Sequence, residues 1–159
     1  MEAKPVRKRT RIWVWVLFAG YTACLLYWMF LGFGRHYQVN GPFSYNLIPF
    51  KTMGIYLFHI HAFSWRTWVI NVFGNIGVFM PYGCLLPCLI HSSRRRYWRF
   101  AIYFGCPLLL LEVMQMVLQV GSFDVDDLIL NGLGASMSYG VYRFYLSRGI
   151  KSSGFPQPR

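Results

Sequence analysis

The chain has 159 residues, of which 55% are hydrophobic, 19% are aromatic and only 13% are charged. Soluble domains carry about 25% charged residues, so this composition excludes an ordinary soluble domain and indicates one small membrane unit. The formal net charge is +11. Because the basic residues form short clusters between apolar runs rather than one stripe, they indicate membrane topology and lipid contact. Nucleic acid is not expected as a partner.

Four apolar runs predict an all-α membrane protein with four transmembrane helices and an interfacial segment between the first and second. The first run, residues 12–33, exceeds the ~20 residues needed to cross a bilayer. Its length favours an uncleaved span over a signal peptide. Residues 34–66 contain helix breakers and many aromatic side chains, so they are predicted to lie at the headgroup level. The other three spans are predicted at about 68–90, 98–120 and 128–145.

The distribution of basic residues predicts the orientation. With four spans, 13 of the 16 Lys and Arg residues fall on one side of the membrane, and three (Arg35, Lys51 and Arg66) fall on the other. This asymmetry fits the positive-inside rule with both termini cytoplasmic. We therefore expect residues 1–11 to be a disordered basic tail and residues 148–159 to be a second basic tail.

Acidic residues are rare and concentrated. Four of the five lie within 16 positions: Glu112 is inside the third predicted span, and Asp124, Asp126 and Asp127 lie in the turn before the fourth. Ionisable groups at a membrane are costly to bury, so they are functional candidates by default. In the predicted topology these carboxylates lie at the outer mouth of the helix bundle.

Uncharged polar side chains extend this cluster. Each of three predicted helices has polar side chains at a spacing that puts them on one face. The third helix has Glu112, Gln115 and Gln119, and the fourth has Asp124, Asp127 and Asn131. The second helix has Asn71 and Asn75. In lipid such faces must meet each other or line a water-filled cavity. We therefore predict one ligand-binding polar site, with Lys51 as a candidate cationic partner.

A structural interpretation competes at most of these positions. Helix–helix hydrogen bonding, worth roughly 0.6 kcal/mol per interaction, fits four amides equally well: Asn71, Asn75, Gln115 and Gln119. Asp124 and Asp126 also suit the first turn of a helix, and for Asp126 this interpretation is favoured. Glu112 is expected to be protonated, paired with a cation or used in function. The ligand spacing typical of a metal site is absent, so neither a metal nor another cofactor is expected.

Four motifs, in order, resemble those of the VanZ-like family of membrane proteins. They are residues 46–52 (NLIPFKT), residues 71–87 (matching N-x-x-G-N-x-x-x-F-x-P-x-G-x-x-x-P), residues 112–115 (EVMQ) and residues 124–134 (DVDDLI with Asn131 and Gly134). Ser138 stands where the family often has a closing glycine, and its small side chain should preserve close helix packing. The resemblance implies a VanZ-like four-span domain at residues 12–147 in a bacterial inner membrane.

The founding member of that family is linked to teicoplanin resistance, so the resemblance implies, by family analogy alone, a contribution to glycopeptide tolerance. The first hypothesis is a non-enzymatic envelope protein that binds an amphiphilic ligand, such as a lipoglycopeptide or a cell-wall lipid precursor. The alternative is an intramembrane enzyme acting on a lipid or precursor headgroup, with Glu112 as the general base. A small transporter and a purely structural partner protein are further alternatives, and the oligomeric state is left open.

Overall fold

The computed structural model describes residues 8–32, 42–58, 61, 64–90 and 96–152. Most of them are helical, as predicted, and two short strands pair in parallel. The helices are α1 (Lys8–Phe30), α2 (Lys51–Phe58), α3 (Trp65–Val69), the π-helix η2 (Ile70–Gly74), α4 (Asn75–Leu89), α5 (Tyr97–Val117) and α6 (Val125–Ser152). The strands are β1 (Tyr45–Asn46) and β2 (Phe123–Asp124).

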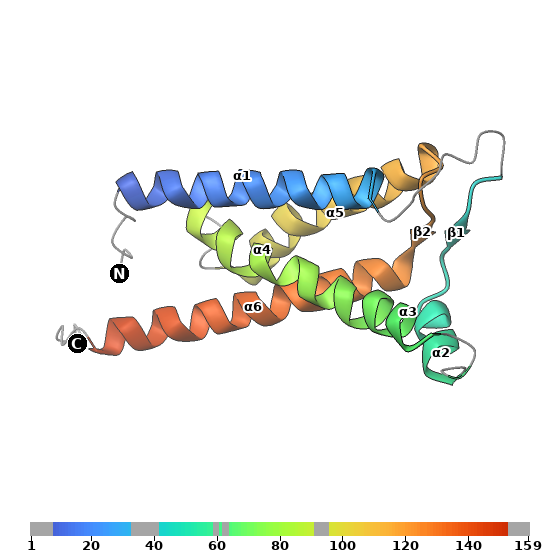
Figure 1. Ribbon diagram of the computed structural model, residues 1–159. Helices are drawn as coiled ribbons and strands as arrows, with labels where there is room; N and C mark the ends of the chain where they lie inside the picture. Colours follow the sequence, from blue (N-terminus) through green and yellow to red (C-terminus); the bar gives the residue numbers. More distant parts are fainter. Residues whose placement is uncertain (1–7, 33–41, 59–60, 62–63, 91–95, 153–159) are drawn as a thin grey trace.

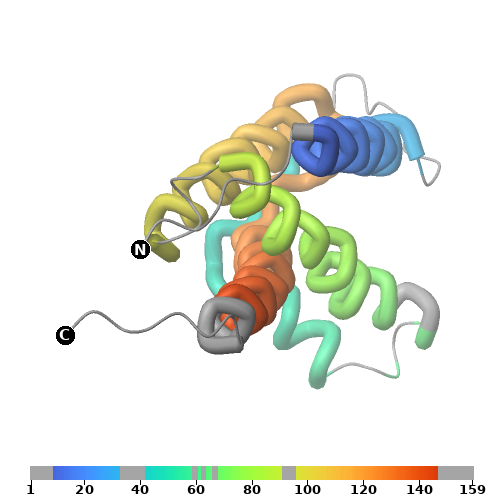
Figure 2. Tube along the Cα trace, turned by 90° about the vertical axis from the view of Figure 1, so that its left-hand side faces the viewer, coloured from blue at the N-terminus to red at the C-terminus, as the bar shows by residue number. Residues whose placement is uncertain are grey.

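The long helices form a bundle whose two ends differ (Figure 1). The strands, α2 and α3 gather at one end, which we call the capped end. The start of α1 and the end of α6 lie at the opposite end. Seen along the bundle, α4 runs between α1 and α6 (Figure 2), and it contacts α1, α5 and α6. The acidic residues before and within α6 therefore lie at the capped end.

Within the described residues, three helical stretches are long and apolar enough to cross a membrane. They are Arg9–Phe30, Ile70–Leu89 and Tyr97–Val117, close to the three spans predicted at 12–33, 68–90 and 98–120. The span predicted at 128–145 lies inside α6, which is not one of these candidates. Much of one α6 face consists of small residues packed on α4, so this helix is less apolar than a lipid-facing span. Its passage through the membrane stays a prediction.

The helices extend into both predicted tails. Helix α1 begins at Lys8, so residues 8–11 are helical, and the expectation that they are disordered was wrong. Helix α6 runs through Ser152 and includes the start of the predicted tail at 148–159. Each added residue makes one more backbone hydrogen bond once a helix is nucleated, which favours such extension. Residues 1–7 and 153–159 lie outside the described residues.

Helices α4 and α6 cross with unusually close backbones. A Cβ atom at Gly134 would overlap the carbonyl oxygen of Ile76, and one at Gly83 would overlap Ser138 Oγ and the Ala135 carbonyl. The Ser138 hydroxyl donates a hydrogen bond to the Met80 carbonyl. Small residues on both helices therefore allow this crossing, as expected for Ser138 in place of glycine.

Aromatic side chains of α4, α5 and α6 pack together in the core. Phe100 stacks on Tyr139 with ring centroids 4.4 Å apart. Phe104 packs edge-on against Phe79, and both side chains are buried. Offset and edge-to-face pairs of this kind add about 0.5–1.5 kcal/mol beyond the burial of their area. This core holds α5 at a fixed position beside the α4–α6 pair.

Candidate functional site

Asp124 links the turn before α6 to the segment before α2. It is 7% exposed, and its Oδ1 accepts a hydrogen bond from Asn46 Nδ2 at 3.0 Å. Its Oδ2 accepts one from Thr52 Oγ1 at 2.6 Å. The backbone N–H of Asp126 also donates to Oδ1 at 2.9 Å, so Asp124 caps the first turn of α6. Both carboxylate oxygens are thus occupied by contacts within the fold.

Asp126 caps a different helix. It is 1% exposed, and its carboxylate accepts hydrogen bonds from the N–H groups of Phe50 at 2.5 Å and Met53 at 3.0 Å. These N–H groups lie at the start of α2, where the helix dipole favours a negative charge. The structural interpretation favoured for Asp126 therefore fits its contacts, although its carboxylate serves α2 rather than α6. Phe50 has a φ of 64°, in the left-handed region.

Asp127 faces α4 and Tyr56. Its Oδ1 accepts a hydrogen bond from Asn75 Nδ2 at 2.5 Å, which joins α6 to α4. Burial raises the pKa of Tyr56, and the negative charges of Asp127 and Asp124 raise it further. Trp68 Nε1 donates to the Tyr56 carbonyl at 3.0 Å and ties α2 to α3.

Tyr56 is a further candidate site residue, and it belongs to the segment at 34–66 that was predicted to be interfacial. A signal for it was available in the spacing, because Tyr56 follows Thr52 by one helical turn and shares its face. Thr52 contacts Asp124 directly. What the sequence does not contain is the direction in which α2 faces, since that depends on its contacts with Asp126.

Three polar side chains from α5 and α6 lie deeper in the bundle. Glu112, Gln115 and Asn131 are 3%, 5% and 2% exposed, so none of them faces lipid. Gln115 Nε2 donates to the Met29 carbonyl of α1 at 2.8 Å, which is the helix–helix role considered for it. Asn131 Oδ1 is buried and accepts no hydrogen bond from the described part of the chain. A buried acceptor of this kind favours a donor that enters from outside the fold.

The remaining predicted positions belong to other elements. Lys51 is exposed at the start of α2 and forms no ion pair with a carboxylate in the described ranges, so its role in ligand binding stays a prediction. Asn71 lies in the π-helical turn η2 and is partly exposed. Helix α5 ends at Val117, and Gln119 adopts a left-handed φ of 53°. Its predicted place on the same helical face as Glu112 was therefore wrong. The side chain of Arg66 lies outside the described residues.

Residues 18–146 match a family model described as VanZ/LLP1. The chain belongs to the VanZ-like family. Neither the curated proteins nor the solved structures gave a match. In this VanZ-like protein, hydrogen bonds connect residues of three motifs that are far apart in the sequence. Asn46 and Thr52 contact Asp124, and Asn75 contacts Asp127.

Exposed apolar side chains of the VanZ-like protein surround the same end. Phe43 and Phe50 are 58% and 62% exposed, on the segment that Asp124 and Asp126 hold in place. We call the exposed apolar residues of this segment the apolar rim: Phe43, Tyr45, Leu47, Ile48 and Phe50. The described residues contain no group of three His, Cys, Asp or Glu side chains that could hold a metal ion. The capped end thus combines acidic and amide oxygens inside with apolar surface outside.

Proposed function

We propose that this VanZ-like protein binds an amphiphilic ligand of the bacterial envelope at its capped end. The ligand class is a lipoglycopeptide or a cell-wall lipid precursor, which has both an acyl chain and a polar headgroup. In the proposal, the four long helices cross the inner membrane, both termini are cytoplasmic and the capped end faces outward. Binding of a glycopeptide at this site would contribute to teicoplanin tolerance.

The observation that supports ligand binding is the pairing of a polar interior with an apolar rim. The acyl chain of the ligand would lie against rim side chains such as Phe50, at the depth of the lipid headgroups. Its cationic or hydroxyl groups would donate hydrogen bonds to Asp127, Glu112 and Asn131. Charge-assisted hydrogen bonds of this kind are about twice as strong as neutral ones.

The proposed orientation of the protein in the membrane follows from the distribution of its basic and acidic residues. Arg96, Arg99 and Arg143 belong to the parts of α5 and α6 distant from the acidic turn, and the described acidic residues are all near the capped end. The positive-inside rule then places the arginine-rich end in the cytoplasm.

The contacts within the site decide which substitutions can test it. Asp124 and Asp126 accept hydrogen bonds from the segment that carries the apolar rim, so replacing them would disturb the rim itself. The Asp127 hydrogen bond joins α6 to α4 instead. Glu112→Gln and Asp127→Asn keep the side-chain volume and remove one charge each. Glu2→Gln is the matched control, because Glu2 is the one acidic residue outside the cluster.

The experiment is expression of each variant in a sensitive strain, with teicoplanin and vancomycin tolerance compared. We expect the native chain and Glu2→Gln to raise teicoplanin tolerance more than vancomycin tolerance. Glu112→Gln and Asp127→Asn should lose that increase at equal protein level in the membrane. Unchanged teicoplanin tolerance in both site variants would refute the pocket. Mass spectrometry of ligands retained in native nanodiscs would identify the class directly.

A further inference from the structure

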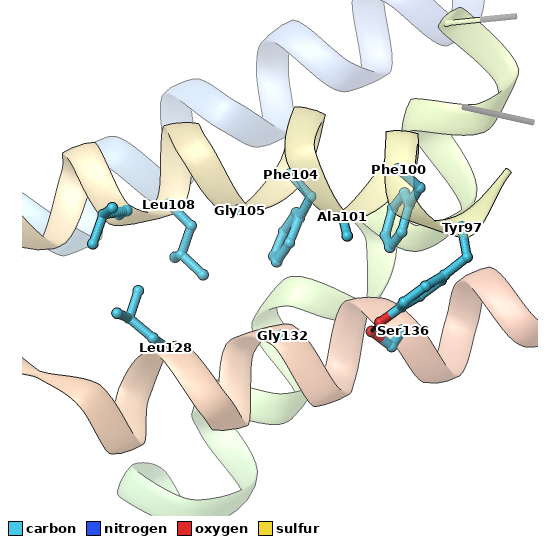
Figure 3. Close-up of a pocket in the computed structure, with 10 residues that line it drawn as sticks. Tyr97, Phe100, Ala101, Phe104, Gly105, Leu108, Leu128, Gly132 and Ser136 are labelled. Carbon is cyan, nitrogen blue, oxygen red and sulfur yellow. Dashed lines mark hydrogen bonds between the residues drawn. The ribbon is translucent and has the colours of Figure 1, made fainter. Parts of the chain in front are cut away.

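A separate groove opens between α5 and α6, away from the acidic oxygens. It has a volume of about 320 Å³. Figure 3 shows Phe100, Phe104 and Leu108 on one side and Leu128 on the other. Its polar groups are the hydroxyls of Tyr97 and Ser136, which hydrogen-bond to each other at 2.8 Å at one end. The remaining lining is apolar, so water gains few partners there.

Glycines keep this groove open. Gly105 of α5 and Gly132 of α6 both line it, and a Cβ atom added at either position would meet no atom within 4 Å. The situation is the reverse at Gly134, where a Cβ would overlap Ile76 on α4. The small residues of α6 therefore serve two purposes. One set allows contact with α4, and the other leaves space beside α5.

The dimensions suit one hydrocarbon chain. Along α5 the lining extends from Tyr97 to Leu109, which is about 18 Å at 1.5 Å per residue. Half of a ~30 Å hydrocarbon core is about 15 Å, so the groove is about as long as one leaflet is thick.

The charged residues near the Tyr97 end of the groove indicate which kind of lipid headgroup would suit it. Arg96 is exposed and directly precedes Tyr97. Arg143 is also exposed, and it follows Ser136 by seven residues, which places it on the same face of α6. The described acidic residues lie toward the other ends of α5 and α6. An anionic phosphate is therefore favoured beside this end, and a cationic headgroup is not.

We propose that the α5–α6 groove holds one acyl chain of an anionic phospholipid, with the phosphate near Arg96 and Arg143. The lipid belongs to the leaflet at the arginine-rich end. The site is independent of the ligand proposed for the capped end, because the two share no residue. A bound lipid here would fill the space between α5 and α6 and support their relative position.

The test uses the full chain in nanodiscs made of equal parts phosphatidylglycerol and phosphatidylethanolamine, followed by native mass spectrometry. The native chain should retain one phosphatidylglycerol in preference to phosphatidylethanolamine. Gly132→Leu and Gly105→Leu place side chains in the groove and should abolish that retention. Gly140→Leu is the control, because a Cβ there also meets no atom within 4 Å but does not line the groove.

A charge variant tests the headgroup separately. Arg143→Gln should lower the preference for phosphatidylglycerol about five-fold, the effect of one cation near a membrane surface, while the acyl chain is still retained. Retention in both Gly132→Leu and Gly105→Leu equal to that in Gly140→Leu would overturn the proposal. So would equal retention of both lipids by the native chain. A dimer that Gly132→Leu dissociates would assign the groove to a second copy of the chain instead.

Discussion

Asn46 and Asp124 are 78 positions apart in the sequence, and a 3.0 Å hydrogen bond joins their side chains. The same asparagine contacts Thr52 and the backbone of Ile48, so it orders the turn that leads into α2. Through this pair, the segment between the first two long helices is fixed to the start of the last one. The positions of the apolar rim and of Tyr56 both depend on it.

We expect Asn46→Ala to lower the free energy of unfolding by about 2 kcal/mol, because Asp124 would lose a charge-assisted hydrogen bond in a buried setting. Unfolding in detergent, followed by circular dichroism, measures the change. Lys51→Gln is the control, since that exposed side chain forms no ion pair in the described residues, and it should leave the unfolding curve unchanged. Equal stability of the two variants would show that the Asn46 contact is not important for the cap.

Phe50→Gly should separate folding from ligand binding. An L-residue in the left-handed region costs about 1–2 kcal/mol, which glycine does not incur. The backbone bond from residue 50 to Asp126 is kept. We therefore expect stability to be maintained while the rim loses a phenyl group that is 62% exposed. Phe50→Val should destabilise the fold, because a β-branched residue suits this φ least.

The result to measure for Phe50→Gly is teicoplanin tolerance at equal protein level. A loss of tolerance together with an unchanged melting temperature supports contact between the rim and the ligand. Full tolerance with an unchanged melting temperature would contradict a role for this side chain.

Gly134→Ala should disrupt the crossing of α4 and α6. The new methyl group would overlap the Ile76 carbonyl oxygen, and overpacking of this kind costs about 1–3 kcal/mol. Gly140→Ala adds the same methyl group on the same helix, where a Cβ meets no atom within 4 Å. That control should stabilise by about 0.5–1 kcal/mol through helix propensity. Parallel melting curves of the two variants give the comparison, and identical curves would argue against the tight crossing.

The raised pKa of Tyr56 predicts that the protein loses stability at alkaline pH. Burial and two nearby carboxylates raise its pKa above the ordinary value of about 10. The folded state then holds the phenolic proton more tightly than the unfolded state does. The stability that this raised pKa contributes is fully present below the ordinary tyrosine pKa. It is lost as the pH rises from there through the pKa of Tyr56 in the folded state.

Melting temperatures between pH 8 and pH 11 would measure this effect. The native chain should lose more stability at high pH than Tyr56→Phe does. Asp127→Asn should reduce the slope in part, because it removes one of the two negative charges. Parallel curves for the native chain and Tyr56→Phe would show that the Tyr56 hydroxyl is not held close to these carboxylates.

Local patterns in the sequence were sufficient for much of the fold. Apolar runs predicted three helices to within a few residues, because their composition alone decides that they can cross a bilayer. Helix α6 was harder, because the part of its surface that packs on α4 has small rather than large apolar side chains. The close packing at Ser138 was also predictable, because small residues at helical spacing have few other uses in a membrane.

The sequence indicated which polar residues are candidates for the site but not what each of them contacts. Helical spacing grouped Asp124, Asp127 and Asn131 on one face, whereas Asp124 ends strand β2 and precedes α6. It could not show that Asp126 accepts N–H groups from the start of α2, since no local signal links positions 76 residues apart. The same spacing wrongly included Gln119, because it assumed that α5 continues beyond Val117.

The sequence by itself therefore determined that this is a helical membrane protein of the VanZ-like family with one concentrated group of acidic and amide side chains. Those features depend on composition and on short-range order along the chain. Only the tertiary structure decided which carboxylates are bonded to the fold and which oxygens face the interior. A carboxylate that already accepts backbone hydrogen bonds has fewer lone pairs left for a ligand, and such donors come from distant segments whose positions depend on the packing of the whole bundle.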